Sequence, residues 1–292
     1  MAGQILRLAD GRSLGFAVLG DPGGLPLLFL HGTPGSRLQF VIGDAAGREL
    51  GLAIVAPDRW GYGLSDTPDT PSLPAFADDM ASLMDHLGKP RFAVAGISGG
   101  GPYAAAVAAR LASRVTALAL ISPMGQVAEP DAMCSLSPFH RFCFQVLPRC
   151  PAVTRAVFRL FRASLDHAPR LAAELATLRA GPRDKALIAR PDVAAWLLGS
   201  FREGLRRGVA GPALDLQLFS RPWAVDLSAI HAPARVWIGT ADTAVPVSAA
   251  RRLSQSIPAS VETELVSEGH FWVATRYREV LDWINAAVHG SA

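Results

Sequence analysis

The chain has 292 residues, enough for one large domain or two small ones with a substantial buried core. Half of the residues are hydrophobic and 18% are charged, so the composition indicates a globular protein and excludes a disordered one. The net charge of +3 is modest, and no basic run is longer than a pair of arginines. Nucleic-acid binding is not expected, because it favours a denser basic stripe.

The beginning of the chain has no long apolar stretch behind a basic start, so we expect no signal peptide. No window approaches the roughly 18 uninterrupted apolar residues of a membrane-spanning helix. The cysteines Cys134, Cys143 and Cys150 match no zinc or redox spacing. We expect them to be small buried side chains in a reducing compartment, and the chain to be cytoplasmic.

In chain order, residues 5–20 first predict a hairpin of two strands around Asp10-Gly11. Short, mostly apolar runs that end in polar or glycine-rich residues follow, and helical patterns separate them. This alternation predicts an α/β fold with a mostly parallel sheet and helices on both faces, which binds ligands at the carboxyl ends of its strands. The predicted strands are 26–32, 52–58, 91–98, 115–123, 234–242 and 261–267, and the predicted helices are 37–50, 73–88, 100–113, 247–257 and 271–288.

The alternation stops between about Met124 and Arg221, where helical segments broken by prolines replace the buried strands. We expect residues 124–221 to be an inserted helical cap, or lid, above the carboxyl ends of the strands. Residues 1–123 and 222–292 would then form the core.

The stretch GISGG at residues 96–100 joins a predicted strand to a predicted helix, which is the context of a G-x-S-x-G nucleophile elbow. Such a turn strains the serine backbone, and Gly96 and Gly100 let the strand and the helix approach closely. We therefore predict Ser98 as a nucleophile at a helix N-terminus. A phosphate-cradling loop is disfavoured, because its lysine and the following Ser or Thr are missing.

A nucleophilic serine needs a base, and His270 directly follows a predicted strand end late in the chain. Asp242 ends the preceding predicted strand, where a carboxylate would orient the imidazole and stabilise the imidazolium. The order Ser98, Asp242, His270 is the one expected for this elbow.

The loop after residue 30 supplies the remaining part of the predicted site. The backbone N–H groups of Thr33 and Gly99 are the expected donors of an oxyanion hole, since Pro34 has no N–H. His31 is expected to be a structural hydrogen-bonding residue in this loop, not a second base.

Together these residues resemble the α/β-hydrolase superfamily, as a serine-nucleophile member with a helical lid. The stretch DRWGYGLSD at 58–66 resembles the D-x-x-G-x-G-x-S loop of that superfamily, and HGTPGSR at 31–37 is similar to loops of small bacterial members. The resemblance implies Ser98 as nucleophile, Asp242 as acid and His270 as base, with no metal or organic cofactor. It does not identify the substrate, because the superfamily places many chemistries on one scaffold.

The expected activity is that of a serine carboxylesterase, which cleaves an ester through an acyl-enzyme. A peptidase similar to proline iminopeptidases is an alternative, in which Glu174 and Glu203 could bind the substrate amine. Carbon–carbon bond hydrolases and cofactor-free haloperoxidases share the triad, and a ligand-binding receptor on the same fold is the non-enzymatic alternative. Haloalkane dehalogenases and epoxide hydrolases have an aspartate where Ser98 stands, which excludes them.

The predicted lid is rich in arginine and phenylalanine. Between Arg141 and Arg207, 12 arginines and one lysine stand against five acidic residues. This pattern fits a pocket for an apolar group with an acidic end, a basic amphipathic surface that rests on membranes, or a lid core of phenylalanines with arginines in water. The expected partner is a small-molecule substrate with an apolar acyl or aromatic group.

Overall fold

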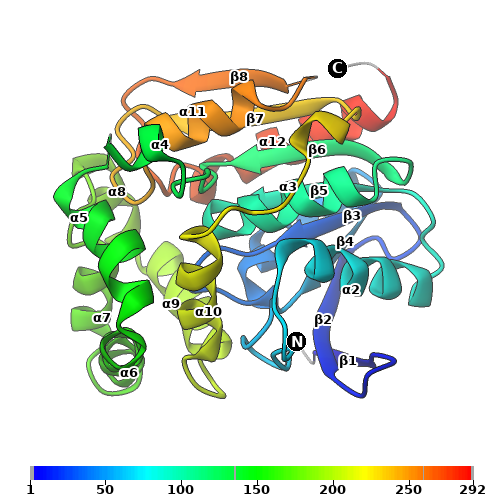
Figure 1. Cartoon of the computed structure of the whole chain (residues 1–292). Coiled ribbons are helices and arrows are strands. Elements are labelled where there is room, and N and C mark those ends of the chain that lie inside the picture. The colour runs from blue at the N-terminus through cyan, green and yellow to red at the C-terminus, as the bar shows by residue number, and fades with distance from the viewer. Residues whose placement is uncertain (1–2, 135, 259, 291–292) are drawn as a thin grey trace.

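The computed structural model describes residues 3–134, 136–258 and 260–290, and it contains one eight-stranded sheet (Figure 1). The strand order is β1-β2-β4-β3-β5-β6-β7-β8. The strands are β1 (Gln4–Arg7), β2 (Ser13–Gly20), β3 (Leu25–Leu30), β4 (Leu52–Pro57), β5 (Phe92–Ile97), β6 (Val115–Ile121), β7 (Ala234–Gly239) and β8 (Ser260–Leu265).

The sheet is antiparallel at one side and parallel over the rest. Strands β1 and β2 form the predicted hairpin, and β2 also pairs antiparallel with β4. The pairs β4–β3, β3–β5, β5–β6, β6–β7 and β7–β8 are all parallel. The carboxyl ends of these six strands therefore lie at one edge of the sheet, which places the loops that follow them close together.

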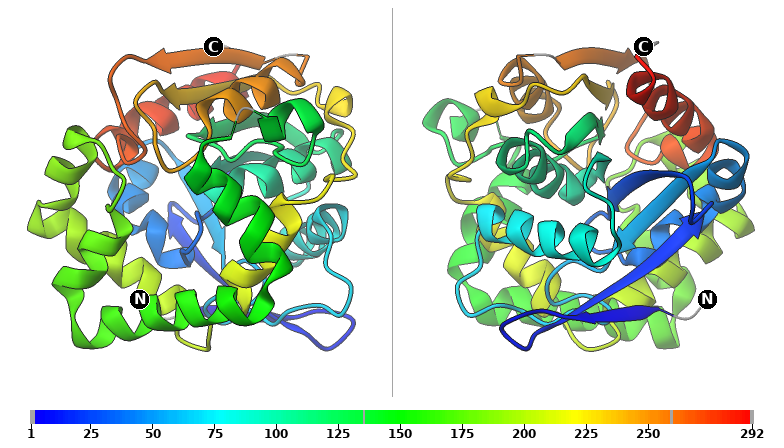
Figure 2. Two further views of the ribbon diagram at one scale, coloured as in Figure 1. Left: turned by 60° about the vertical axis from the view of Figure 1, so that its left-hand side comes forward. Right: turned by 90° about the vertical axis from the view of Figure 1, so that its right-hand side faces the viewer.

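Helices cover both faces of the sheet, so the predicted α/β fold is confirmed (Figure 2). On one face, side chains of α2 (Leu73–His86), α3 (Gly101–Arg110) and α11 (Val247–Gln255) share a buried cluster with the strands. On the other face, α12 (Val273–Val288) buries Val280, Leu281 and Ile284, next to η1 (Arg37–Gly43) and α1 (Asp44–Glu49). The sequence produces this arrangement because the central strands are apolar on both faces and need cover on both.

The chain between β6 and β7 consists of helices joined by loops, with no strand among its described residues. These helices gather at one end of the sheet, on the left in Figure 1. They bury a second cluster, in which Leu165, Leu197 and Phe201 take part together with Tyr62 from the loop after β4. The segments are α4 (Pro130–Cys134), α5 (Pro138–Arg141), η3 (Phe142–Val146), η4 (Leu147–Arg149), α6 (Pro151–His167), α7 (Pro169–Ala176), α8 (Pro182–Ile188), α9 (Pro191–Gly204) and α10 (Ala210–Phe219), and the 3-10 turn η5 (Leu227–Ala229) follows them.

The structure differs from two expectations. Cys134 and Cys150 are exposed and Cys143 is partly buried, so the expectation of three buried cysteines is wrong. Strand β8 is not apolar on both faces: it is the edge strand, and Val261 is 56% exposed. Among the described residues, no helix has both the length and the apolar character needed to cross a bilayer.

Candidate active site

Ser98 occupies a strained turn between β5 and α3. Its φ of 53° lies in the left-handed region, which is unfavourable for a residue with a side chain. The turn is possible because its glycines leave no Cβ in the way: a Cβ on Gly96 would lie 2.5 Å from the Gly100 carbonyl oxygen, and one on Gly100 would lie 2.3 Å from that of Leu30. The local sequence thus positions Ser98 at the carboxyl edge of the sheet.

The structure brings Ser98, His270 and Asp242 together from the ends of three different strands. The Ser98 Oγ lies 2.9 Å from His270 Nε2, and His270 Nδ1 lies 2.7 Å from Asp242 Oδ2. An ionised carboxylate only accepts hydrogen bonds, so Nδ1 of a neutral His270 carries the proton and Nε2 is free to accept one from Ser98. The other carboxylate oxygen of Asp242 accepts the backbone N–H groups of Ala244 and Val245, which fixes its orientation.

His270 is 8% exposed, and two carboxylates act on it. Burial lowers the pKa of its imidazole, but the charge and hydrogen bond of Asp242, together with the charge of Asp184, outweigh burial and raise that pKa above its ordinary value. The surroundings therefore favour an imidazolium, the species that a general base becomes when it takes a proton.

The loop after β3 lies directly against the serine turn. A Cβ on Gly32 would be 3.3 Å from the Ser98 Cβ, and one on Gly99 would be 2.1 Å from the Thr33 Oγ1. The Thr33 N–H donates none of the loop hydrogen bonds found within residues 3–134, 136–258 and 260–290. The Gly99 N–H belongs to the first turn of a helix, where N–H groups have no partner within the helix. Both expected oxyanion donors thus belong to segments that meet at the serine turn.

A buried polar cluster holds this loop in place. The Asp215 carboxylate forms a bidentate ion pair with the Arg59 guanidinium, at 2.6 and 2.9 Å, and both side chains are at most 1% exposed. Asp215 also accepts hydrogen bonds from the hydroxyls of Tyr62, Tyr103 and Thr33, at 2.5 to 2.7 Å. Arg59 in turn donates to the carbonyl oxygen of Gly32. Asp215 belongs to α10, so the segment between β6 and β7 contributes directly to the loop beside Ser98.

His31 is enclosed in the same cluster and does not face Ser98 as a base. Its Nε2 accepts the Arg59 backbone N–H at 3.0 Å, so Nδ1 carries the proton and donates to the Gly32 carbonyl oxygen at 2.8 Å. Burial and the charge of Arg59 lower the pKa of His31 well below its ordinary value. The ring is therefore a neutral structural group.

The loop that carries His270 is held by a second buried carboxylate. Asp184 in α8 is 1% exposed and accepts the backbone N–H of His270 at 2.7 Å and that of Phe271 at 2.9 Å. A Cβ on Gly269 would lie 2.1 Å from an Asp184 carboxylate oxygen, so this carboxylate occupies the space beside the glycine. Across the residues that the structure describes, no ion pair joins Asp184 to a cation.

The sequence analysis missed both carboxylates. Asp215 lies between two leucines of an apolar helix, and a lone acid in such a helix is a usable signal for a buried partner. Asp184 follows Pro182 at the start of a helix, where an exposed acid is common, so nothing in the local pattern distinguishes it.

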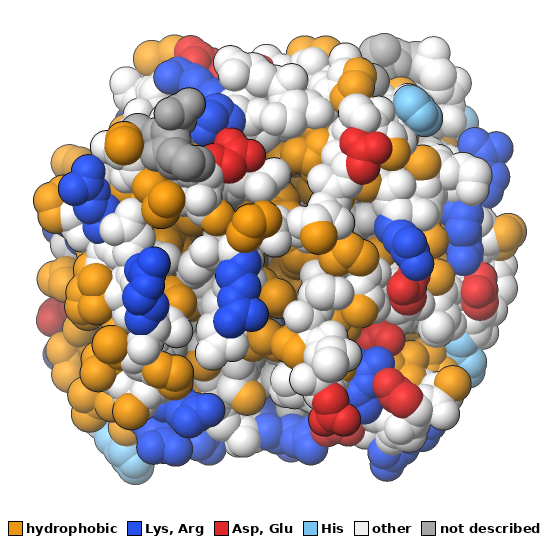
Figure 3. All heavy atoms as spheres, viewed as in Figure 1, with side chains coloured by type: hydrophobic (Ala, Val, Ile, Leu, Met, Phe, Trp, Pro, Cys, Tyr) orange, Lys and Arg blue, Asp and Glu red, His pale blue; other side chains and the backbone are white. Residues whose placement is uncertain are grey.

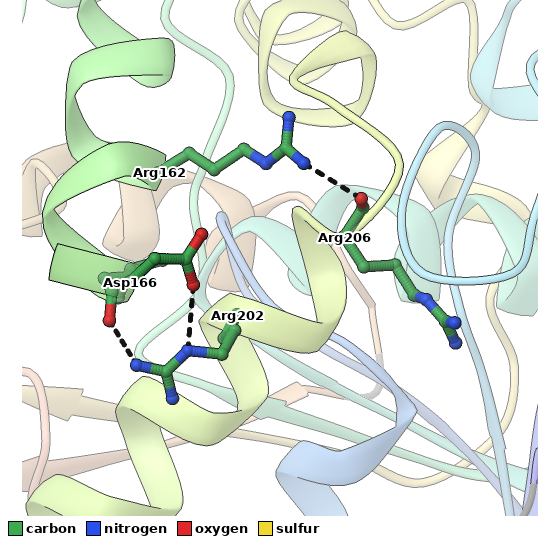
Figure 4. Close-up of a pocket in the computed structure, with 5 residues that line it drawn as sticks. Arg162, Asp166, Arg202 and Arg206 are labelled. Atoms are coloured by element: carbon green, nitrogen blue, oxygen red, sulfur yellow. Dashed lines mark hydrogen bonds and ion pairs between the residues drawn. The ribbon is translucent and has the colours of Figure 1, made fainter.

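The arginines of segment 124–221 face the solvent. Of the 12 between Arg141 and Arg207, 11 are exposed and Arg162 is partly buried. Figure 4 shows a hollow on this surface, in which Arg162 bonds the Arg206 carbonyl oxygen and Arg202 bonds Asp166. Most arginines of this segment are therefore in contact with solvent, and Arg183 among them pairs with Glu268 of the loop before His270.

The two glutamates considered for a substrate amine differ in their surroundings. Glu203 pairs with Arg37 at 2.8 Å and with Arg206 at 3.1 Å, and Glu174 is exposed on α7. Within the described part of the chain, no cluster of three or more His, Cys, Asp or Glu residues could hold a metal ion.

Comparison with known proteins gives the family. Three solved structures match almost the whole chain: an esterase from Thermogutta terrifontis (23% identity, TM-score 0.64, 98% of this chain and 99% of that chain), an enol-lactonase from Burkholderia xenovorans (20%, 0.68, 96% and 99%) and a bromoperoxidase from Bacillus anthracis (17%, 0.72, 97% and 99%). At these identities the likeness concerns the fold alone. The sequence profile of the α/β hydrolase fold matches residues 26–276, and the chain therefore belongs to the α/β hydrolase family.

Proposed function

We propose that this α/β hydrolase is a serine carboxylesterase with Ser98, His270 and Asp242 as its catalytic triad. The observation that carries the proposal is the hydrogen-bonded chain from Ser98 Oγ to His270 Nε2, at 2.9 Å, and from His270 Nδ1 to Asp242 Oδ2, at 2.7 Å. These distances lie within the range in which a base can take the proton of a nucleophile.

In the acylation step, the Ser98 oxygen attacks the carbonyl carbon of the ester while His270 Nε2 takes the hydroxyl proton. Asp242 stabilises the imidazolium that forms. The negative charge that develops on the carbonyl oxygen is stabilised by the N–H groups of Thr33 and Gly99, which lie beside Ser98. His270 then donates its proton to the departing alkoxide, and the acyl group remains on Ser98.

In the second step, a water molecule gives a proton to His270 and attacks the acyl carbon. The tetrahedral intermediate collapses, the carboxylic acid leaves and the proton returns to Ser98. Every proton transfer in this scheme uses His270 Nε2, so a substitution of His270 or Ser98 stops both steps.

An apolar acyl or aromatic group suits the surroundings of the serine. A Cβ on Gly99 would lie 3.3 Å from the Phe219 ring, and the Phe271 ring meets the His270 ring edge to face with centroids 5.2 Å apart. Apolar side chains beside the serine turn and beside the histidine ring favour substrates that bury apolar surface on binding.

We also propose that residues 124–221 form a cap over a core of residues 1–123 and 222–292. Three contacts support it: Asp215 reaches the oxyanion loop, Asp184 reaches the histidine loop, and the Thr243 hydroxyl beside Asp242 donates to the Arg179 carbonyl oxygen. Substrate would then reach Ser98 beneath this cap.

The test is the initial rate on p-nitrophenyl esters from acetate to decanoate, for the wild type and Ser98→Ala. We expect turnover by the wild type and an initial rate lower by several orders of magnitude in Ser98→Ala. Ser82→Ala is the matched control, since that serine is exposed on α2 and should leave the rate unchanged. The acyl chain length with the highest rate indicates the length of the acyl pocket.

A fluorophosphonate probe separates the alternatives. A folded wild type that labels at Ser98 but hydrolyses no ester would indicate a peptidase or a carbon–carbon bond hydrolase. A folded wild type that does not label would contradict an activated serine and favour a ligand-binding receptor.

A further inference from the structure

The buried carboxylate of Asp184 lies at the contact between the proposed cap and the histidine loop. We propose that Asp184 is a positioning residue: it holds His270 in register with Ser98 and adds a second negative charge beside the imidazole. This inference rests on the proposed function, because it assigns Asp184 an effect on the base of that triad.

Asp184 holds the histidine loop through two backbone N–H groups. Its two oxygens accept the N–H groups of His270 and Phe271, one each, just before α12 begins at Val273. Both N–H groups precede the N-cap of α12, Trp272, so neither has a partner within the helix, and a carboxylate is a strong acceptor for a backbone N–H. The donor comes from the core and the acceptor from α8, so the contact fixes the position of His270 relative to the cap.

The space around the carboxylate is restricted. Gly269 lacks the Cβ that would lie within 2.5 Å of all three carboxylate atoms, so the loop approaches Asp184 as closely as its backbone permits. Arg183, the neighbour of Asp184, forms a 2.9 Å ion pair with Glu268 on the same loop. A shift of α8 would therefore move the histidine backbone, and a displacement of about 1 Å in a reacting group can reduce the rate by about 100-fold.

Asp184 also acts through its charge. The charged groups that face the His270 ring are Asp242 from the loop after β7 and Asp184 from α8, and both favour the imidazolium. Because no cation pairs with Asp184 among the described residues, its field on the ring is not cancelled. Removal of this charge should make the imidazolium easier to deprotonate.

The experiment measures fluorophosphonate labelling of Ser98 against pH in the wild type, Asp184→Asn and the control Asp192→Asn. Asp192 is exposed on α9 and pairs with Arg190, so the control makes the same chemical change on the cap surface. We expect labelling by Asp184→Asn to be slower by about 10- to 100-fold and its acid limb to lie at lower pH. The control should match the wild type, and both variants should keep the wild-type circular dichroism.

The outcomes separate this inference from the proposed function. If the wild type labels and Asp184→Asn labels at the same rate with the same acid limb, the positioning role is wrong and the triad stands. If the folded wild type does not label, both proposals fall. Labelling needs no identified substrate, so the choice of ester does not affect this test.

If Asp184→Asn does not fold, Gly269→Ala and Asp184→Ala, alone and combined, test the positioning role. Gly269→Ala keeps every charge but drives a Cβ into the carboxylate, and we expect it to slow labelling. Asp184→Ala opens room for that Cβ, so the double variant should lose less than the product of the two single losses. If the loss of labelling rate in the double variant equalled the product of the two single losses, the inference would be overturned.

The outer surface of the proposed cap exposes apolar side chains. On α6 they are Val153 at 48%, Val157 at 42% and Leu160 at 72%, spaced i, i+4 and i+7. Helix α7 and the turn after it repeat this spacing with Leu171, Leu175 and Leu178. In Figure 3, hydrophobic and basic side chains lie side by side at the lower left, where Figure 1 shows α6 and α7. At about 3.6 residues per turn, Arg155 and Arg159 lie on the side of α6 away from its three exposed apolar side chains, so the apolar and basic side chains of this helix form separate surfaces.

Discussion

Two buried aspartates reach the loops on opposite sides of Ser98, and they differ in how their charge is balanced. Asp215, on the oxyanion side, faces the Arg59 guanidinium and accepts hydrogen bonds from three hydroxyls. Asp184, on the histidine side, meets two backbone N–H groups and, among the described residues, no cation. A compensated carboxylate mainly anchors its neighbours, whereas an uncompensated one also acts on the charge of the imidazole. Substitutions on the two sides should therefore separate stability from catalysis.

The largest effect is expected on the histidine side, at Asp242. In Asp242→Asn, the neutral side chain no longer favours the Nδ1–H form of His270, so Nε2 can no longer accept the Ser98 proton. We expect kcat on a p-nitrophenyl ester to fall by up to about 10⁴-fold, as in other triads, with little change in the urea midpoint.

Asp226→Asn is the control for this prediction, because Asp226 is an exposed loop aspartate away from the triad. If Asp242→Asn retained a tenth of the activity or more, as judged against about the 10⁴-fold loss expected for a triad acid, Asp242 would not be the acid of this triad.

The next effect is expected on the oxyanion side and concerns stability. Asp215→Ala leaves the Arg59 guanidinium buried without its partner, and such a change costs about 3 to 5 kcal/mol in the free energy of unfolding. Asp184→Ala leaves only two N–H groups without an acceptor, so its loss should be smaller. Urea denaturation of both variants measures the difference, and an equal or reversed order would contradict the distinction between the two sides.

A smaller pair of effects tests whether the Asp215 cluster positions the oxyanion loop. Thr33→Val and Tyr103→Phe each remove one hydrogen bond to Asp215, worth about 1.5 to 3 kcal/mol for a bond to a charged group. Only Thr33 lies against Gly99. We expect similar losses in the free energy of unfolding but a lower kcat in Thr33→Val alone. An equal fall of kcat in Tyr103→Phe would mean that the whole Asp215 cluster, and not the Thr33 contact alone, fixes the position of the oxyanion loop.

The sequence predicts the sheet and the residues at its edge for a common reason. Buried parallel strands appear as apolar runs, and the polar residue that ends each run must lie at the carboxyl edge, so Ser98, Asp242 and His270 could be placed there before their contacts were known. Strand β8 is the exception, because an edge strand needs only partial burial and its pattern is mixed.

The contacts between the helical segment 124–221 and the loops could not be predicted in the same way. Asp184 lies 86 residues from His270, and Asp215 lies 182 residues from Thr33. No periodicity links positions so far apart when one of them is in an irregular helical segment. The exposure of Cys134 and Cys150 could not be predicted for a related reason, since burial within segment 124–221 depends on how its short helices pack.

The last and smallest effect is a pH dependence that the two sides should not share. The proposed mechanism needs neutral His270, and the pKa of His270 is raised above its ordinary value of 6.5. We therefore expect kcat/KM to fall as pH drops through a midpoint above 6.5. Thr33→Val should lower the rate at every pH without moving that midpoint, because the charge of Asp215 is balanced by Arg59.

Stability should follow the opposite trend. A raised pKa means that protonation favours the folded state, so the contribution of His270 is fully present below the unfolded pKa of about 6.5 and is lost as pH rises through the folded pKa. The protonation state that stabilises the fold is therefore the one that cannot catalyse. In the wild type, as pH rises through the pKa of His270, the ester rate should rise while the urea midpoint falls. Both changes should be displaced to lower pH in Asp184→Asn, because one of the two charges that raise this pKa is gone. Parallel curves would contradict His270 as the base.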